Sequence, residues 1–443
     1  MRYRACALLA FLALTGCVGD SARPVATGKG AVRMINALDN APAVGFFIEE
    51  RFLETVNAQQ GSSLQQWDDL EYNFNMEVNV GGELEARRIA TETLNVEVDR
   101  EYALLLTGAF DDPTVTVWET AEREFDGTET VFEVRFTHLS SAGSAAVYLL
   151  PEGEAPAADN ALGTLASGEF LAPVDVEAGE YVLTITEAGD PAAVLYRSIA
   201  GEFGARVATT LAFTDGTSAD TAPYSVQLIG ASGDSVTLRD ARFAPTVRLF
   251  QAAIALPDAD VYPADDLVNP FVANHVFGDV TGDLAIETGS NPLTYTAVGN
   301  TSVTLLESGV NADLGRRYNL VVIAVDDDFQ GINYVIDRSP DFSIARLLAF
   351  QASANHPEVD IYVVERDAGF EGTGLALSGL GLGGINTISF GPRQLDLYAT
   401  TSGEDTVLAG PVPLDLELGE FVELFILDTV DPATVELRVV PAP

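Results

Sequence analysis

The sequence predicts an all-β protein that consists of four tandem immunoglobulin-like antiparallel β-sandwich domains. Three observations lead to this fold class. Apolar and polar residues alternate with period two in segments rich in Val, Thr and Tyr, clusters of turn residues separate these segments, and one motif recurs along the chain. The 443 residues, 47% of them hydrophobic, are enough to form several packed cores.

The recurring motif opens each expected domain. Phe250-Gln251-Ala252 and Phe350-Gln351-Ala352 lie 100 residues apart, and the same frame fits Ile35-Asn36-Ala37 and, with a one-residue gap, Phe136-Thr137-His138. The residues that follow the two best copies also match: Pro257, Asp260, Val261 and Tyr262 in one, and Pro357, Asp360, Ile361 and Tyr362 in the other. Repetition at this length is typical of tandem sandwich domains.

A second marker closes each copy, namely a strand that an aromatic residue opens, followed by a turn and a shorter strand. These closing strands begin at Tyr102, Tyr224, Tyr318 and Phe421. The two markers together place the four sandwiches at residues 32–121, 131–240, 245–338 and 345–441. The clearest helix-like segment, Leu64 to Leu70, is expected to form no more than one helical turn in a loop.

The N-terminus has the pattern of a lipoprotein signal peptide over residues 1–16. Arg2 and Arg4 precede a short apolar stretch, and Leu14-Thr15-Gly16-Cys17 resembles a bacterial lipobox. The resemblance implies cleavage before Cys17 and lipidation of its thiol, although an ordinary signal peptide is the alternative. Residues 17–31 then form a flexible tether, and the membrane is a partner through the anchor. In lipoproteins an Asp after the cysteine signals inner-membrane retention, so Val18 favours the outer membrane.

The net charge limits the classes of partner, and the positions of the cysteines limit the possible disulfides. The formal net charge is -43, and such a field repels nucleic acid and anionic head groups, so no nucleic-acid partner is expected. An acidic, soluble surface adapted to salt is the simplest explanation. Cys6 lies in the signal peptide and Cys17 is the lipid site, so the mature chain contains no disulfide.

The opening motifs also resemble those of a known family. Val32 to Val44 and the Pro257-Asp258-Ala259-Asp260-Val261-Tyr262 segment, with the later Tyr-initiated strand, are similar to the DUF4397 domain, a bacterial envelope β-sandwich module of unassigned function. The resemblance implies the same fold and location but no activity. The family usually has a histidine in the opening motif, and the matching positions here are Asn36, His138, Gln251 and Gln351.

No catalytic motif is found in the sequence. It contains no Gly-x-Ser-x-Gly, His-Glu-x-x-His or phosphate-binding loop, and Lys29 is the only lysine. His138, His275 and His356 belong to different copies, so we interpret them as structural residues at the surface or at strand ends. The glycine-rich segment Leu377 to Ile385 is expected to be a strand or loop, and Trp67 and Trp118 are expected to pack in cores.

Acidic turns provide the only candidate metal ligands. Asp279 and Asp283 flank Gly282, and Asp326, Asp327 and Asp328 form a second group. Calcium prefers such oxygen ligands, but Asp is also a common turn residue, so calcium binding and a purely structural role both remain open. The same ambiguity applies to Asp258, Asp260, Asp265 and Asp266. No other cofactor is expected.

Two functions of different classes follow from the sequence. The favoured one is a non-catalytic, lipid-anchored cell-envelope protein, which acts as a scaffold or as a binding or adhesion module toward an envelope protein or a glycan. The alternative is a carbohydrate-active or other hydrolytic envelope enzyme with carboxylates at an interdomain cleft.

Overall fold

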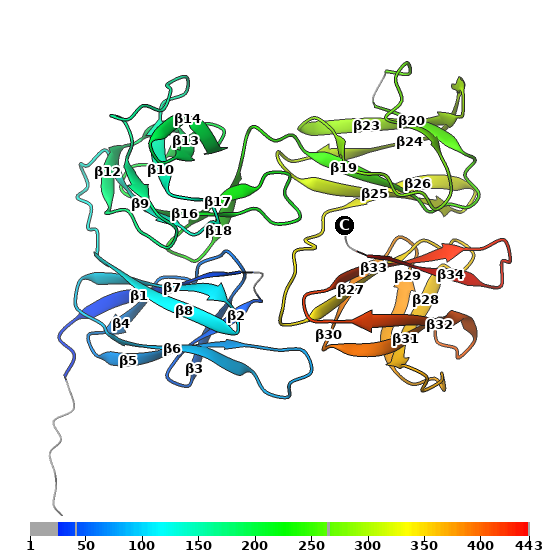
Figure 1. Ribbon diagram of the computed structural model, residues 1–443, viewed down its shortest axis with the longest axis horizontal. Coiled ribbons are helices and arrows are strands. Elements are labelled where there is room, and N and C mark those ends of the chain that lie inside the picture. Colours follow the sequence, from blue (N-terminus) through cyan, green and yellow to red (C-terminus); the bar gives the residue numbers. More distant parts are fainter. Residues whose placement is uncertain (1–24, 40–41, 264–265, 442–443) are drawn as a thin grey trace, which may run out of the picture.

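A computed structural model describes residues 25–39, 42–263 and 266–441, and over these ranges the protein consists of strands, turns and loops (Figure 1). Eight sheets pack in pairs, so the prediction of tandem β-sandwiches is confirmed. None of these residues belongs to a helix that is long and apolar enough to span a membrane.

The first sandwich, which we call sandwich 1, has eight strands in two sheets. Its strands are β1 (Lys29–Asp39), β2 (Val44–Ile48), β3 (Arg51–Val56), β4 (Gln65–Asp68), β5 (Glu71–Val78), β6 (Arg87–Asn95), β7 (Arg100–Ala109) and β8 (Asp112–Ala121). One sheet has the order β4-β1-β7-β8 and the other β3-β2-β5-β6. The first strand therefore begins at Lys29, inside the segment that we expected to be tether.

Sandwich 2 keeps this order and adds two strands, β15 and β18. Its strands are β9 (Val131–His138), β10 (Ala145–Leu150), β11 (Gly163–Leu165), β12 (Val174–Glu177), β13 (Gly179–Glu187), β14 (Asp190–Arg197), β15 (Gly201–Phe203), β16 (Ala208–Asp215), β17 (Tyr224–Ile229) and β18 (Ser235–Arg239). The sheets are β12-β9-β16-β17-β18 and β11-β10-β13-β14, with β15 paired to β13.

Sandwiches 3 and 4 repeat the eight-stranded arrangement. Sandwich 3 contains β19 (Thr246–Gln251), β20 (Ala259–Pro263), β21 (Val272–His275), β22 (Leu284–Ala285), β23 (Gly289–Ala297), β24 (Asn300–Ala312), β25 (Arg317–Val325) and β26 (Asp328–Tyr334). Sandwich 4 contains β27 (Ala345–Gln351), β28 (Glu358–Glu365), β29 (Leu375–Gly381), β30 (Ile385–Phe390), β31 (Arg393–Thr401), β32 (Val407–Leu416), β33 (Phe421–Asp428) and β34 (Val435–Pro441). The strands of the four sandwiches span residues 29–121, 131–239, 246–334 and 345–441.

The pairing of the first strand differs from the purely antiparallel sheets that we expected. In sandwiches 1, 3 and 4 the first strand runs parallel to the seventh, as β1 does to β7, and in sandwich 2, which has the extra strand β15, β9 runs parallel to β16; the remaining pairs are antiparallel. The strand order also differs from the ABED and CFG sheets of immunoglobulin constant domains, although the two-layer architecture is the same. Alternation along a strand reports which face is buried but not the direction of the neighbour.

The sandwiches associate in two pairs through the sheets that contain their first strands. Interface 1–2, between sandwiches 1 and 2, buries Ile35, Ala103, Leu105, Ala212 and Ile229, and Trp118 stacks on Phe170 there. Interface 3–4, between sandwiches 3 and 4, buries Phe250, Ala252, Val321, Ile323, Leu348, Phe350, Ala352, Phe421, Phe425 and Leu427. Because a first strand is covered by its own sandwich on one face and by the paired sandwich on the other, it consists of a nearly continuous apolar run.

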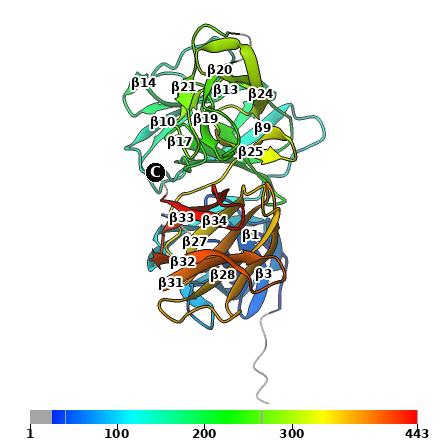
Figure 2. The same ribbon diagram turned by 90° about the vertical axis from the view of Figure 1, so that its right-hand side faces the viewer.

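Further contacts join the two pairs into a two-by-two arrangement (Figures 1 and 2). Sandwiches 2 and 3 meet where the Thr221 N–H donates to the Gly315 carbonyl at 2.8 Å. Sandwiches 1 and 4 meet where the Gly81 N–H donates to the Ser343 carbonyl at 2.7 Å, and Leu418 of sandwich 4 packs on the core of sandwich 1. A side chain at Gly391 would collide with the Gly81 backbone, so glycine is required for this approach.

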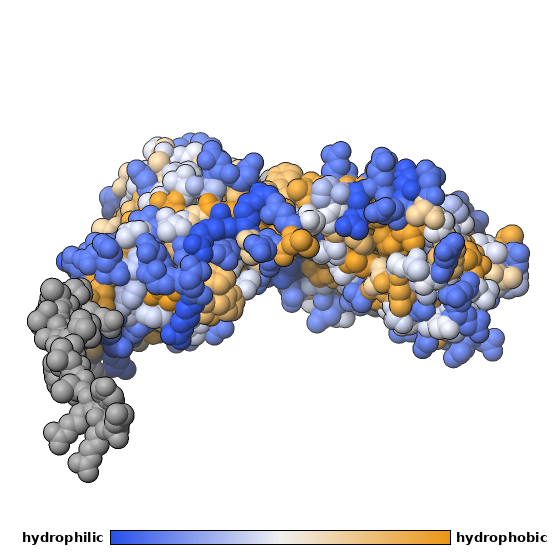
Figure 3. Space-filling view, turned by 90° about the horizontal axis from the view of Figure 1, so that it is seen from below, coloured by the Kyte–Doolittle hydropathy of each residue, from blue (hydrophilic) through white to orange (hydrophobic). Residues whose placement is uncertain are grey.

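Seen from below, sandwiches 1 and 4 form two lobes (Figure 3). Hydrophilic residues cover much of this face, and the hydrophobic residues lie in scattered patches between them. Such a distribution agrees with the excess of acidic side chains in the sequence.

Two local expectations can be compared with the structure. Leu64 to Leu70 does not form a helical turn, because Gln65–Asp68 is the edge strand β4, which pairs with β1. A short apolar run cannot be assigned by periodicity alone. The glycine-rich segment Leu377 to Ile385 is a strand and a turn, as expected, since it contains most of β29 and crosses to β30 in the other sheet.

Candidate functional site: an arginine-lined cleft

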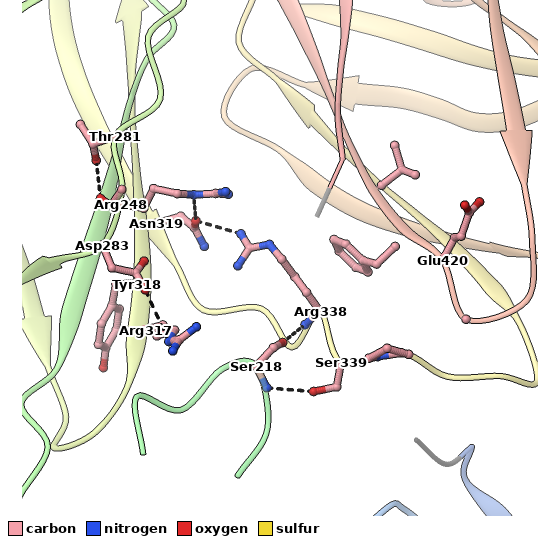
Figure 4. Close-up of a pocket in the computed structure, with 15 residues that line it drawn as sticks. Ser218, Arg248, Thr281, Asp283, Arg317, Tyr318, Asn319, Arg338, Ser339 and Glu420 are labelled. Carbon is pink, nitrogen blue, oxygen red and sulfur yellow. Dashed lines mark hydrogen bonds and ion pairs between the residues drawn. The ribbon is translucent and has the colours of Figure 1, made fainter. Parts of the chain in front are cut away.

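A cleft with a volume of about 690 Å³ lies where sandwiches 3 and 4 meet a loop of sandwich 2 (Figure 4). The segment between β26 and β27 passes along it. Ser218 of sandwich 2 holds this segment, because its N–H donates to Ser339 Oγ at 2.8 Å and its hydroxyl accepts the N–H of Arg338. The lining residues are Ser218, Arg248, Thr281, Gly282, Asp283, Arg317, Tyr318, Asn319, Arg338, Ser339, Pro340, Gly419, Glu420, Phe421 and Val422.

A buried ion-pair network forms one wall of the cleft. Glu423, on β33, is fully buried, and its two carboxylate oxygens accept hydrogen bonds from Arg248 at 2.6 Å and from Arg338 at 2.9 Å. Asn319 Oδ1 accepts from both arginines, at 3.0 and 2.9 Å. The network therefore connects β19 and β25 of sandwich 3, the segment between the sandwiches, and β33 of sandwich 4.

The buried part of this network contains more positive than negative charge. Arg248 and Arg338 are 13% and 9% exposed, and Glu423 is the one buried carboxylate that they share. Burial, with the charge of Glu423, raises the pKa of Tyr334, so its hydroxyl stays neutral and donates to Glu423 at 3.3 Å. Two buried guanidinium groups against one carboxylate leave a net charge of about +1, which is costly without a further anion or solvent.

Arg317 adds a third guanidinium at the mouth of the cleft. Its Nε lies 3.6 Å from Asp283 Oδ2, which is an ion pair but too long for a hydrogen bond, and the two side chains are 40% and 44% exposed. The Nε atoms of Arg317 and of Arg338 are both buried and have no hydrogen-bond partner. Buried arginine donors without a partner occur at both interfaces, because Arg135 Nη2 of interface 1–2 also has none.

Interface 1–2 has the same architecture but is closed at the corresponding place. Arg33 pairs in register with Ala103 on β7, as Arg248 does with Asn319 on β25. The cavity beside Arg33 has a volume of only about 10 Å³. Leu64, Trp118 and Thr210 are among the residues around this small cavity.

Interface 1–2 buries equal numbers of guanidinium and carboxylate groups. Arg135 is 5% exposed, donates to Glu133 at 2.6 Å and forms a second, short bond with Glu101 across the interface. Burial lowers the pKa of Arg33 to about 10, which leaves it protonated near neutral pH. Two guanidinium groups thus face two carboxylates.

Sequence reasoning did not identify these arginines as a group, although a signal was present. Arg33, Arg135 and Arg248 lie three residues before Asn36, His138 and Gln251, which occupy one position of the repeat. An arginine at one repeat position in three of four first strands is unusual in a chain with so few basic residues. The fourth copy has Leu348 there, and Glu423 lies beside it in register.

The residues at the third position after these arginines, and at the matching position in the fourth copy, share a structural role. Asn36 Oδ1, His138 Nδ1, Gln251 Oε1 and Gln351 Oε1 each accept the N–H of the residue two positions later. His138 Nε2 also lies 2.8 Å from the Gly143 carbonyl, and Asn36 donates to the Pro42 carbonyl at 3.0 Å. Three different side-chain types therefore hold the turn after the first strand.

The three histidines lie at the ends of strands or in loops, and they do not belong to the ion-pair network of the cleft. His138 and His275 are buried rather than at the surface, and His275 Nε2 lies 3.2 Å from the Asp279 carbonyl. Burial lowers the pKa of His275. His356 is half-buried in the turn after β27. None of the three lines the cleft.

The acidic residues proposed for calcium are not brought together. Among the described residues, no three His, Cys, Asp or Glu side chains cluster as metal ligands. Asp283 pairs with Arg317, Asp279 Oδ2 accepts the Val276 N–H at 3.3 Å, and Asp326 to Asp328 form the β25–β26 hairpin. Calcium binding stays a prediction without a preformed site. Asp265 of the third acidic group lies outside the described residues.

The other predicted residues are accounted for as follows. Trp67 packs on the core of sandwich 1, and Trp118 stacks on Phe170 with ring centroids 4.6 Å apart. The lipobox and Cys17 lie outside the described residues. Of the carboxylates in the cleft, Asp283 and Glu420 come from opposite sides in Figure 4, and Glu420 accepts the Glu417 N–H at 2.8 Å.

The fold and the cleft define a tandem β-sandwich protein with an interdomain cavity. No protein-family model and no curated protein sequence matches the chain. Among solved structures it is similar to the Bacillus anthracis TIE protein, with 12% identity, a TM-score of 0.17 and coverage of 91% of this chain and 69% of that one. It is also similar to the Bacteroides ovatus mixed-linkage glucan utilization locus SGBP-B, solved with a mixed-linkage heptasaccharide, with 10% identity, a TM-score of 0.11 and coverage of 89% and 96%. These likenesses are too weak to support a function, and the DUF4397 resemblance stays a prediction.

Proposed function

We propose that the chain is a lipid-anchored, non-catalytic protein of the bacterial outer membrane that acts as a binding or scaffold module. The observation that carries the proposal is the way that buried interfaces join four similar sandwiches into one body, with a cleft between sandwiches 2, 3 and 4. A ligand site between domains of a rigid scaffold is a common arrangement.

The N-terminus supports the anchored part of the proposal. β1 begins at Lys29, so residues 17–28 separate the proposed lipid site from the folded body. Such a segment spans about 40 Å when extended, which is enough to hold the body clear of the head groups. The acidic surface, which membranes repel, also fits a body held away from the bilayer.

The side chains that usually perform acid-base or nucleophilic chemistry support the non-catalytic part. His138 and His275 contact backbone carbonyls, and Lys29 is at the start of β1. Asp283 is paired with Arg317, and Glu423 is shared by two arginines. We therefore propose that these carboxylates stabilise the sandwiches through their ion pairs with arginines, and that they do not cleave a bond.

The anchor is tested by labelling cells that express the full-length protein with an alkyne analogue of palmitate. The wild-type protein should be labelled and should sediment with the outer membrane, while Cys17→Ser should lose both properties. Cys6→Ser is the matched control, because it removes the other cysteine and should leave labelling unchanged. A wild-type protein that is unlabelled or stays in the soluble fraction would contradict the anchor.

A further inference from the structure

Sandwich 2 departs from the eight-stranded arrangement at two strands, β15 and β18, and both line the same pocket. Gly201–Phe203 of β15 forms one side, and Leu238 and its neighbours on β18 form another. The pocket has a volume of about 390 Å³ and lies between strands that belong to the two different sheets of this sandwich. It is therefore found where the fold of sandwich 2 differs from that of the other copies.

One side of the pocket is made by a break in an edge strand. In sandwich 3 the edge strand β24 pairs with β23 from end to end, whereas in sandwich 2 β14 ends at Arg197 and pairing with β13 resumes at Gly201. Between them, the Ser198 hydroxyl accepts the Leu183 N–H at 3.0 Å, so a side-chain oxygen replaces the carbonyl of a regular ladder. Ile199, which also lines the pocket, is 65% exposed. The bulge thus opens the edge of the sandwich.

The inner wall of the pocket is apolar. Tyr181 and Phe203 contribute aromatic rings, whose centroids lie 6.3 Å apart, and Leu228 and Leu238 contribute aliphatic side chains from the other sheet. All four pack against the core of sandwich 2 but are only partly buried. A ligand that covers the rest of their apolar surface would gain free energy from its removal from water.

The hydroxyl groups around the pocket already donate to other groups of the protein. Tyr181 and Ser198 donate to backbone carbonyls at 2.8 and 2.7 Å, and Thr237 donates to a side-chain amide oxygen at 2.9 Å. Arg239 forms an ion pair with Asp220 at 3.1 Å. An apolar ligand leaves these bonds intact, whereas a polar ligand would have to compete with them.

A turn of sandwich 3 closes the pocket on a further side through Leu314. The turn is held against sandwich 2, because the Gly315 carbonyl accepts the Thr221 N–H at 2.8 Å and the Arg317 N–H donates to the Ala219 carbonyl at 2.8 Å. The walls of the pocket are therefore positioned by two sandwiches before a ligand arrives, as is usual in small-molecule sites.

The size and the charges of the pocket set the class of ligand. Its volume lies toward the lower end of the range of small-molecule sites. Glu202 and Asp313, which also line it, are exposed carboxylates in a chain with a net charge of -43, so an anion is disfavoured. We infer that this pocket binds a small apolar molecule that carries no negative charge. The inference rests on the binding role proposed above and names a ligand class for it.

The test is a fluorescence titration of the full-length chain with Cys17→Ser, so that neither a lipid anchor nor detergent competes for the pocket. The probe is N-phenyl-1-naphthylamine, a neutral dye that becomes fluorescent in apolar sites, and its 8-sulfonate is the anionic analogue. We expect one neutral dye to bind per chain and the sulfonate to bind at least about tenfold more weakly. The bound neutral dye should slow hydrogen exchange in residues 198–203 and 236–239.

Two variants place a carboxylate on the pocket without disturbing a core. Leu314 is half-buried and does not belong to the core of sandwich 3, so Leu314→Asp should keep the melting temperature and weaken binding of the neutral dye at least about tenfold. Ile199→Asp should act in the same direction from the exposed rim. Leu267→Asp is the matched control, because Leu267 is an exposed leucine of sandwich 3 outside the pocket, and should leave binding unchanged.

Several outcomes would overturn the inference. They are the absence of saturable binding of the neutral dye, equal affinity for its sulfonate, and an equal loss of binding in Leu267→Asp. Binding of several dyes per chain that neither Leu314→Asp nor Ile199→Asp weakens would assign the signal to exposed apolar surface elsewhere. The anchor would stand in each case, because palmitate labelling tests it separately.

Discussion

Interfaces 1–2 and 3–4 join the same sheets of their sandwiches, yet they accommodate buried arginines differently. In interface 1–2, Trp118 stacks on Phe170 and the space beside Arg33 is almost filled. In interface 3–4, aromatic rings pack around Phe425, and the arginines beside them face an open cleft. One repeat has thus produced a joint that is filled beside Arg33 and a joint that leaves a cleft beside Arg248.

The two interfaces differ in how far their stability depends on the neutralisation of buried charges. Apolar contacts such as the one between Phe250 and Phe425, with ring centroids 4.3 Å apart, hold sandwiches 3 and 4 together without the charged wall. The arginines therefore need not be fully neutralised for the pair to stay assembled. In interface 1–2 the buried arginines have almost no cavity beside them, so their charges must be neutralised by carboxylates.

The largest effect is expected from Phe425→Ala. This side chain is 2% exposed in interface 3–4, and its truncation should cost about 4 kcal/mol of unfolding free energy. Hydrogen exchange should rise in β25, β27 and β33 and stay unchanged in β1 and β7. Leu105→Ala is the matched variant of interface 1–2 and should give the opposite pattern. Uniform acceleration in both variants would show that the pairs do not open independently.

A smaller effect is expected from Glu423→Gln. The change leaves Arg248 and Arg338 buried without a counter-charge and should lower the unfolding free energy in urea by about 3 kcal/mol. Glu101→Gln in interface 1–2 should cost less, about 1 to 2 kcal/mol, because Arg135 keeps its bond to Glu133. Equal losses would contradict the difference in charge balance between the interfaces.

Acidification should weaken sandwich 3 in particular. Burial lowers the pKa of His275 in the folded state, so the neutral ring is favoured there and a proton binds more tightly to the unfolded chain. The resulting stability is present above about pH 6.5, the unfolded value, and is lost as the pH falls below it, by at most about 1.4 kcal/mol per pH unit. Chemical denaturation between pH 5 and 8 measures this slope. His275→Gln should flatten it, and an unchanged slope would exclude His275 as its source.

The smallest effect is expected from divalent ions. Asp283 already has Arg317 as a partner, and the acidic hairpin at Asp326 to Asp328 is not part of a ligand cluster among the described residues. Calcium and magnesium at equal ionic strength should therefore shift the thermal midpoint equally, through screening. A rise specific to calcium would revive the metal hypothesis and locate an ion that the acidic turns reorganise to bind.

The sequence predicted the fold better than the site, for physical reasons. Alternation and turn residues act locally, so the tandem β-sandwich fold could be predicted from them. The parallel pairing of β1 with β7 depends on contacts distant in sequence and has no local pattern. The short strand β4 was missed because four residues carry too little periodicity.

The arginine-lined cleft could be predicted only in part. Arg33, Arg135 and Arg248 occupy one repeat position, and that regularity is visible in the chain. Whether a cavity opens beside them depends on residues from other sandwiches, such as Trp118 in interface 1–2 and Arg338 in interface 3–4. No alternation or motif specifies which sandwiches pair.

Hydrogen exchange of the full-length protein tests the contrast between the two interfaces most directly. We predict faster exchange in residues 317–322, 338–340 and 419–423, which surround the open cleft, than in residues 101–106 of interface 1–2, where the space beside Arg33 is almost filled. Equal exchange at the two interfaces would contradict the difference in packing between them.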